Sequence, residues 1–164
     1  DLIVSNLTLQ WCLPLRPTLQ EWRRVLSPGG LLMLTTLGPD TLTELRQSWA
    51  ALDNTPHVNT FLDMHEIGDA LLQAGFAEPV MDVDRITLTY PDLKPIMRDL
   101  KGIGAQTVTA PGRPQGLLGK QRFAQLQQQY EAFRQPEGLP ATYEVVYGQA
   151  WVPPATRSVA VAFR

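Results

Sequence analysis

The sequence is poor in the residues on which several classes of protein depend. A single cysteine, Cys12, among 164 residues excludes an internal disulfide framework and predicts a reducing, cytoplasmic setting. The two histidines, His57 and His65, lie eight positions apart without an evident third ligand, so we expect no metal site. No apolar run approaches the roughly 20 residues that span a bilayer, and no signal peptide is visible, so we expect no membrane partner.

The sequence also lacks a large excess of either positive or negative charge. The formal net charge is −2 and the isoelectric point is near 5.6, without the basic footprint of a nucleic-acid binder, so we expect no nucleic-acid partner. With 44% hydrophobic and 18% charged residues, a chain of 164 residues is long enough for one domain with a substantial core.

What is present is organised around the stretch Glu21–Gly38. It predicts the end of a helix, a Pro-Gly-Gly turn and a strand, because Leu31 to Leu34 form the continuous apolar run of a strand covered on both faces. Such a unit is typical of an α/β crossover. Ligands in open α/β sheets bind beyond the carboxyl ends of the strands, which here is Thr35–Pro39.

Capping boxes predict where helices begin. In this motif a Ser, Thr or Asp and a Glu three residues later satisfy each other's free backbone N–H groups. The spacing occurs at Thr18–Glu21, Thr41–Glu44 and Asp63–Glu66. It predicts helices from Thr18 to before Pro28, from Thr41 to Leu52, and from Asp63 to a left-handed cap at Gly75.

The sequence predicts further strands and helices in the second half of the chain. Alternation of apolar and polar residues predicts strands over 80–90, at a sheet edge, and over 141–152. Apolar spacings of three and four predict helices over 93–103 and 119–135. Between these helices the sequence predicts a loop over 107–119, and an apolar tail follows at 158–163.

Several segments carry a resemblance to a known family, namely DLIVSNLTLQW, GPDTLTELR, HVNTFLDMHEIGDAL and LTYPDLKPIMRDLKGIGA. Together they resemble the C-terminal half of class I S-adenosylmethionine-dependent methyltransferases, most closely the malonyl-acyl-carrier-protein O-methyltransferases of biotin synthesis. The resemblance implies an α/β, Rossmann-like sheet with an antiparallel last strand. It assigns residues 1–153 to the C-terminal portion of the methyltransferase domain, with substrate-covering helices at about 91–135, and residues 154–164 to a tail or an extra strand.

Two features of that family have no counterpart in this sequence. These are the glycine-rich loop that approaches the cofactor and the acidic residue that holds its ribose. Because the chain also opens directly on a predicted strand at Leu2–Val4, we expect a fragment that does not bind S-adenosylmethionine usefully alone and is inactive by itself. The alternative is a non-catalytic interaction module or split subunit. It would pair through the open edge of Leu2–Val4 with a missing N-terminal half or with its own copy.

The chemistry that the resemblance implies is methyl transfer from a sulfonium to the free carboxylate of a malonyl thioester, carried by acyl-carrier protein or coenzyme A. That carboxylate is already ionised at neutral pH, so we expect no catalytic general base. Ser5, Asn6 and Leu7 follow a strand at its carboxyl end and are expected to contact the cofactor, the alternative being a plain turn.

Four residues are candidates for binding the substrate. Gln10 and Trp11 would line the acceptor pocket, although a large ring is as often part of a core. Arg98 and Lys101 lie on one side of a predicted helix. They would face the malonyl carboxylate or the acidic surface of a carrier protein, the alternative being ordinary solvated charges.

Overall fold

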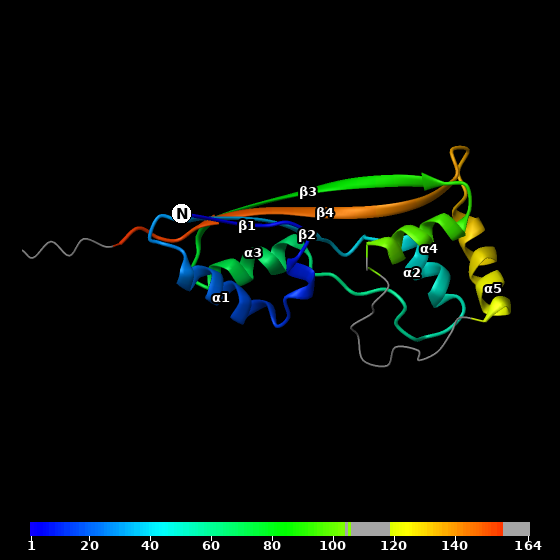
Figure 1. The fold of residues 1–164 in the computed structure, drawn as a ribbon, viewed down its shortest axis with the longest axis horizontal. Coiled ribbons are helices and arrows are strands. Elements are labelled where there is room, and N and C mark those ends of the chain that lie inside the picture. Colours follow the sequence, from blue (N-terminus) through cyan, green and yellow to red (C-terminus); the bar gives the residue numbers. More distant parts are fainter. Residues whose placement is uncertain (104, 106–118, 156–164) are drawn as a thin grey trace, which may run out of the picture. The chain divides into compact units, whose positions relative to one another are not determined.

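The computed structural model describes residues 1–103, 105 and 119–155. Four strands form one sheet in the order β1-β2-β4-β3 (Figure 1). They are β1 (Leu2–Ser5), β2 (Leu31–Leu37), β3 (Ala77–Tyr90) and β4 (Leu139–Trp151). Strands β1 and β2 are parallel, and the sheet as a whole is mostly antiparallel. The predicted α/β fold with an antiparallel last strand is confirmed.

The chain divides into two compact units. Unit 1 comprises Asp1–Thr36, Asp63–Val83 and the described residues from Val146 onward, and unit 2 comprises Leu37–Leu62 and Asp84–Val145. The predicted loop over 107–119 falls, apart from Gly119, outside the described residues, as does the tail at 158–163. None of the helices in the described part of the chain is long and apolar enough to cross a membrane.

In unit 1, two helices cover one face of the sheet. These are α1 (Leu15–Val25) and α3 (Met64–Gln73), which lie side by side in Figure 1. Leu19 of α1, Leu71 of α3 and Leu32 of β2 are fully buried. Successive strand residues point to opposite faces, and Met33 on the other face of β2 is 43% exposed, so the prediction that this strand is covered on both faces is wrong for the described chain.

The capping box at the start of α3 is confirmed. The Asp63 carboxylate accepts hydrogen bonds from the backbone N–H groups of His65 and Glu66, at 2.7 and 2.9 Å, and the Glu66 carboxylate accepts one from the Asp63 N–H at 3.0 Å. The helix ends at Gln73 and is followed by Gly75, whose φ of +89° is the left-handed conformation that glycine adopts without strain. The 3.6-residue period and both caps were therefore correctly predicted from local sequence.

The other two predicted capping boxes are wrong. Helix α1 begins at Leu15, after Pro14, and the Thr18 hydroxyl donates to the backbone carbonyls of Cys12 and Pro14. Helix α2 (Thr43–Ala50) begins after Leu42, which has φ of +54°. There the Thr41 hydroxyl bonds the backbone of Glu144 instead of capping the helix.

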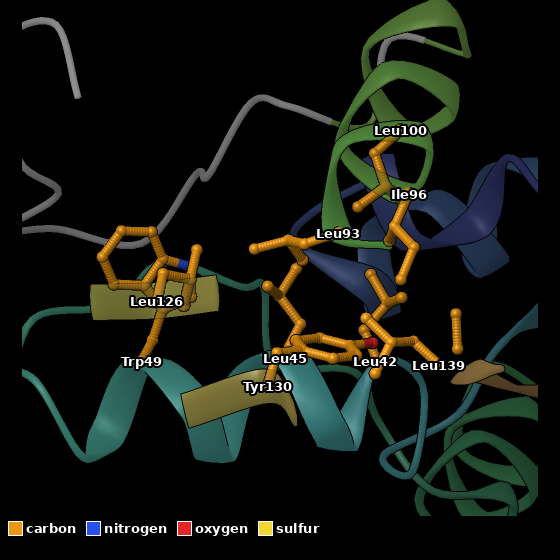
Figure 2. Close-up of a cluster of buried hydrophobic side chains, with 10 residues drawn as sticks. Leu42, Leu45, Trp49, Leu93, Ile96, Leu100, Leu126, Tyr130 and Leu139 are labelled. Atoms are coloured by element: carbon orange, nitrogen blue, oxygen red, sulfur yellow. The ribbon is translucent and has the colours of Figure 1, made fainter. Parts of the chain in front are cut away.

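Unit 2 has its own hydrophobic core. Helices α2, α4 (Leu93–Gly102) and α5 (Lys120–Tyr130) contribute to it, with a short 3-10 turn, Glu131–Phe133, after α5. Figure 2 shows side chains of all three helices meeting in one cluster: Leu45 and Trp49, then Leu93, Ile96 and Leu100, then Leu126 and Tyr130. The Tyr130 hydroxyl, inside this cluster, donates to the Pro140 carbonyl at 2.8 Å, so its polar atom is satisfied.

Candidate functional site

The carboxyl ends of the parallel strands β1 and β2 meet in unit 1 and are tied together by polar groups. The Leu7 N–H donates to both the carbonyl and the hydroxyl oxygen of Thr35, at 3.1 and 3.0 Å. The Thr35 hydroxyl in turn donates to the Asn6 side-chain carbonyl at 2.6 Å. These bonds fix a sharp turn after β1, in which Leu7 has φ of +46°.

Ser5 carries a buried polar atom that is not satisfied. Its residue is 8% exposed, and its Oγ has no hydrogen-bond partner among the residues that the structure describes. A buried hydroxyl without a partner costs about 1–3 kcal/mol. Such an atom at the end of a parallel strand is suited to bind a polar group of a ligand. The Asn6 side-chain NH₂ is a second donor that the described residues leave free.

A hollow of about 400 Å³ opens beside this turn. Ser5, Asn6 and Thr35 are among the residues that line it, together with Val4, Met33, Val80 and Tyr147. These four side chains are between 41% and 66% exposed. Unit 1 therefore presents an apolar sheet face, with polar groups at the strand ends, away from α1 and α3.

The predicted acceptor residues Gln10 and Trp11 lie in the 3-10 turn Leu9–Trp11. Both ends of the Gln10 amide are hydrogen-bonded, because its NH₂ donates to the Leu7 carbonyl at 2.8 Å and its oxygen accepts from the Thr36 hydroxyl at 3.0 Å. Gln10 thus holds the turn in place. Trp11 is 44% exposed, so it is not part of the core of the isolated chain.

Arg98 and Lys101 lie on α4 in unit 2, and both are exposed. Neither side chain makes a hydrogen bond or an ion pair with the described residues. Lys94, one turn before Arg98, is likewise exposed and unpaired within the described part of the chain. The sequence prediction missed Lys94, although its spacing of four from Arg98 could have indicated it.

Two polar clusters of unit 2 were not predicted from the sequence. In the first, Arg85 pairs with Asp40, and the Glu144 carboxylate, 7% exposed, accepts the Asp40 N–H at 2.7 Å. The Glu144 carboxylate also lies against Gly38, where an added Cβ would stand 2.7 Å from its oxygen. These contacts fix the loop that follows β2.

The second cluster surrounds His57. Its ring stacks on Trp49 with centroids 3.7 Å apart, and its Nε2 lies 3.0 Å from the Asp53 carboxylate, which also pairs with Arg122. Burial lowers the pKa of His57, so the ring is neutral at neutral pH and donates from Nε2. His65 lies in the first turn of α3. The described residues contain no group of three or more His, Cys, Asp or Glu side chains placed to hold a metal ion.

Comparison with known proteins shows what the chain is similar to. Residues 1–34, which contain the turn after β1, match a family model described as a methyltransferase domain. The chain is 57% identical over 153 residues to the malonyl-acyl-carrier-protein O-methyltransferase of Gallionella capsiferriformans, covering 93% of this chain and 52% of that protein. The resemblance to these methyltransferases is confirmed.

Other methyltransferases of the same name give the same result. That of Laribacter hongkongensis is 56% identical over 155 residues, covering 94% of this chain and 52% of the relative. The chain thus spans about half the length of the curated relatives it matches.

Solved structures support the fold. A candidate methyltransferase from Bacillus halodurans has a TM-score of 0.55 at 15% identity, and the YcgJ protein of Bacillus subtilis has a TM-score of 0.56 at 13% identity. Each comparison covers 93% of this chain and 64% of the other.

Proposed function

We propose that this chain is the part of a malonyl-acyl-carrier-protein O-methyltransferase that carries the second half of the sheet and the helices covering the substrate. The observation that carries the proposal is the identity of 57% over 153 residues to a relative of that name. The product would be a methyl ester of the malonyl carboxylate, made for biotin synthesis. A cytoplasmic place of action fits a chain with one cysteine.

The cofactor, S-adenosylmethionine, would supply an electrophilic methyl group. The malonyl carboxylate is ionised at neutral pH, so the protein needs no base and contributes by holding the two reactants in line. In this chain Ser5 Oγ and the Asn6 amide would bind polar groups of the cofactor, and the Leu7 side chain would contact it. Gln10 would keep the turn in this conformation, while the exposed Trp11 ring would cover the acceptor.

The uncovered apolar face of unit 1 supports a requirement for a further segment. Val4, Met33, Val80 and Tyr147 expose a contiguous surface of a kind that monomeric proteins seldom leave in water. The relatives are about twice as long as the part of them that this chain matches. We propose that a segment corresponding to the other half of those relatives covers this face and supplies the glycine-rich cofactor loop. The chain alone would then be inactive.

The test joins this chain to the missing part of the Gallionella relative and compares the fusion with the chain alone. Transfer of labelled methyl from S-adenosylmethionine to malonyl-acyl-carrier protein is measured, with unloaded carrier protein as the control. The fusion is expected to methylate and the chain alone to show neither methylation nor micromolar cofactor binding. Activity of the chain alone would refute the need for a further segment. A folded fusion that binds the cofactor but does not methylate malonyl-acyl-carrier protein would refute the proposed substrate.

The alternative is a non-catalytic module that associates through β1. This strand is at one edge of the described sheet, and its Leu2 and Val4 side chains are 55% and 66% exposed. An unpaired edge strand with apolar side chains favours pairing with another chain. Sedimentation velocity distinguishes the two functions. Edge pairing predicts a dimer at high concentration, and the substitution Ile3→Pro should abolish that dimer. A monomer at all concentrations would exclude the alternative.

A further inference from the structure

Of the eight described lysines and arginines of unit 2, four are neutralised or hydrogen-bonded. Arg85 pairs with Asp40, Arg122 with Asp53 and Arg134 with Glu131. Arg46 donates to two backbone carbonyls. Four described cations of this unit make no such contact, and three of them, Lys94, Arg98 and Lys101, lie on α4.

These three residues form a narrow line, which we call the cationic stripe. At about 100° per residue, positions 94, 98 and 101 lie within about 60° of one another around the helix, and they extend over about 10 Å of its length. The acidic residues nearby do not neutralise the stripe. Asp92 caps the helix by accepting the Lys94 N–H at 2.8 Å, and Asp99 faces the Tyr90 hydroxyl.

The stripe is held on a rigid support. Leu93, Ile96 and Leu100, on the opposite side of α4, are at most 5% exposed and point into the core of unit 2 in Figure 2. Three like charges on one helix, without a counter-charge among the described residues, repel one another, which is a cost to the isolated chain. A partner that brings negative charge would remove this cost.

The sequence analysis left two roles open for Arg98 and Lys101, namely binding the malonyl carboxylate or binding the acidic surface of a carrier protein. The exposure of the stripe decides between them. A clamp for one small carboxylate depends on desolvated donors converging on a point, because exposed ion pairs contribute little. Three solvated charges in a line instead match an extended acidic surface, which they would attract and orient. Resting on the function proposed above, we propose that the cationic stripe is the docking surface for an acidic acyl-carrier protein that delivers the malonyl thioester.

The experiment measures binding of fluorescently labelled apo-acyl-carrier protein, which lacks the malonyl group, to this chain by anisotropy at ~50 and ~300 mM NaCl, where screening differs strongly. The test variant is Arg98→Glu with Lys101→Glu. The matched control is Arg16→Glu with Lys120→Glu, which makes the same change in net charge at two exposed positions of α1 and α5. Circular dichroism and thermal melting establish that each variant is folded.

We expect the wild type to bind more weakly at high salt. The test variant should lose about tenfold or more in affinity at low salt, and the control should stay within about twofold. Three results would each overturn this proposal. They are equal losses of affinity in both variants, no binding by the wild type, and displacement of the carrier protein by coenzyme A at the binding constant of coenzyme A itself. Because neither cofactor nor malonyl group is present, failure here is distinguishable from failure of the methylation assay with the fusion.

Discussion

Replacing Ser5 with alanine is expected to stabilise this chain while weakening its proposed site. The Ser5 hydroxyl is buried without a partner among the described residues, so removing it relieves a desolvation cost of about 1–3 kcal/mol. The small gap left by one oxygen atom returns up to about 1 kcal/mol of that gain. The net result is an increase of about 1 kcal/mol in the free energy of unfolding, which raises Tm by about 2–4 °C for a chain of this size.

The control removes a buried hydroxyl that does have a partner. Thr36, 3% exposed, donates to the Gln10 side chain at 3.0 Å, so Thr36→Val is expected to lower the free energy of unfolding by about 1–2 kcal/mol. Urea unfolding followed by circular dichroism measures both variants. If Ser5→Ala destabilises the chain as Thr36→Val does, the hydroxyl has a partner in the isolated chain and the reasoning is refuted.

Ser5→Ala is expected to weaken cofactor binding although it stabilises the chain. In the active fusion, Ser5→Ala is expected to weaken S-adenosylmethionine binding about fivefold to tenfold, because the ligand loses a buried hydrogen bond. Isothermal titration measures the affinity. An unchanged affinity would show that Ser5 does not contact the cofactor.

Three other substitutions probe the units separately. Asp63→Ala should lower the free energy of unfolding, because α3 loses its cap. The backbone N–H of Glu66 holds the pKa of Asp63 below 3.8, so this loss should be present at neutral pH and fade as pH falls below 3.8. Burial, then nearby negative charges, raise the pKa of Tyr143 from 10.0 to about 12, so stability should fall between these pH values, and less so in Tyr143→Phe. Gly138→Ala, with φ of +132° and a Cβ 2.5 Å from the Tyr90 carbonyl, should cost about 2 kcal/mol or more.

Each of these has a matched control. Asp63→Asn keeps an acceptor at the helix start, and should cost less than Asp63→Ala at neutral pH. Tyr147→Phe makes the same change at an exposed tyrosine. Gly102→Ala adds a Cβ with nothing within 4 Å and should be tolerated. A control that behaves as its partner does would contradict the explanation given for that site.

Local sequence determined the elements of this protein wherever their signals were satisfied within a few residues. The capping box at Asp63, the left-handed cap at Gly75 and the apolar strand from Leu31 depend on neighbours in the chain, so they could be predicted. The methyltransferase resemblance likewise came from contiguous motifs, and the comparisons confirmed it.

Tertiary structure decided what depends on distant partners. Thr41 and Glu44 have capping-box spacing, yet Thr41 bonds Glu144 and Glu44 accepts from Thr142, about a hundred positions away. Packing also decided the insertion of β4 between β2 and β3. It likewise left the Ser5 hydroxyl and the Lys94 charge without partners in the part of the chain that the structure describes. The physical reason is that a side chain has one set of hydrogen bonds to make, and the fold determines which partner is within reach.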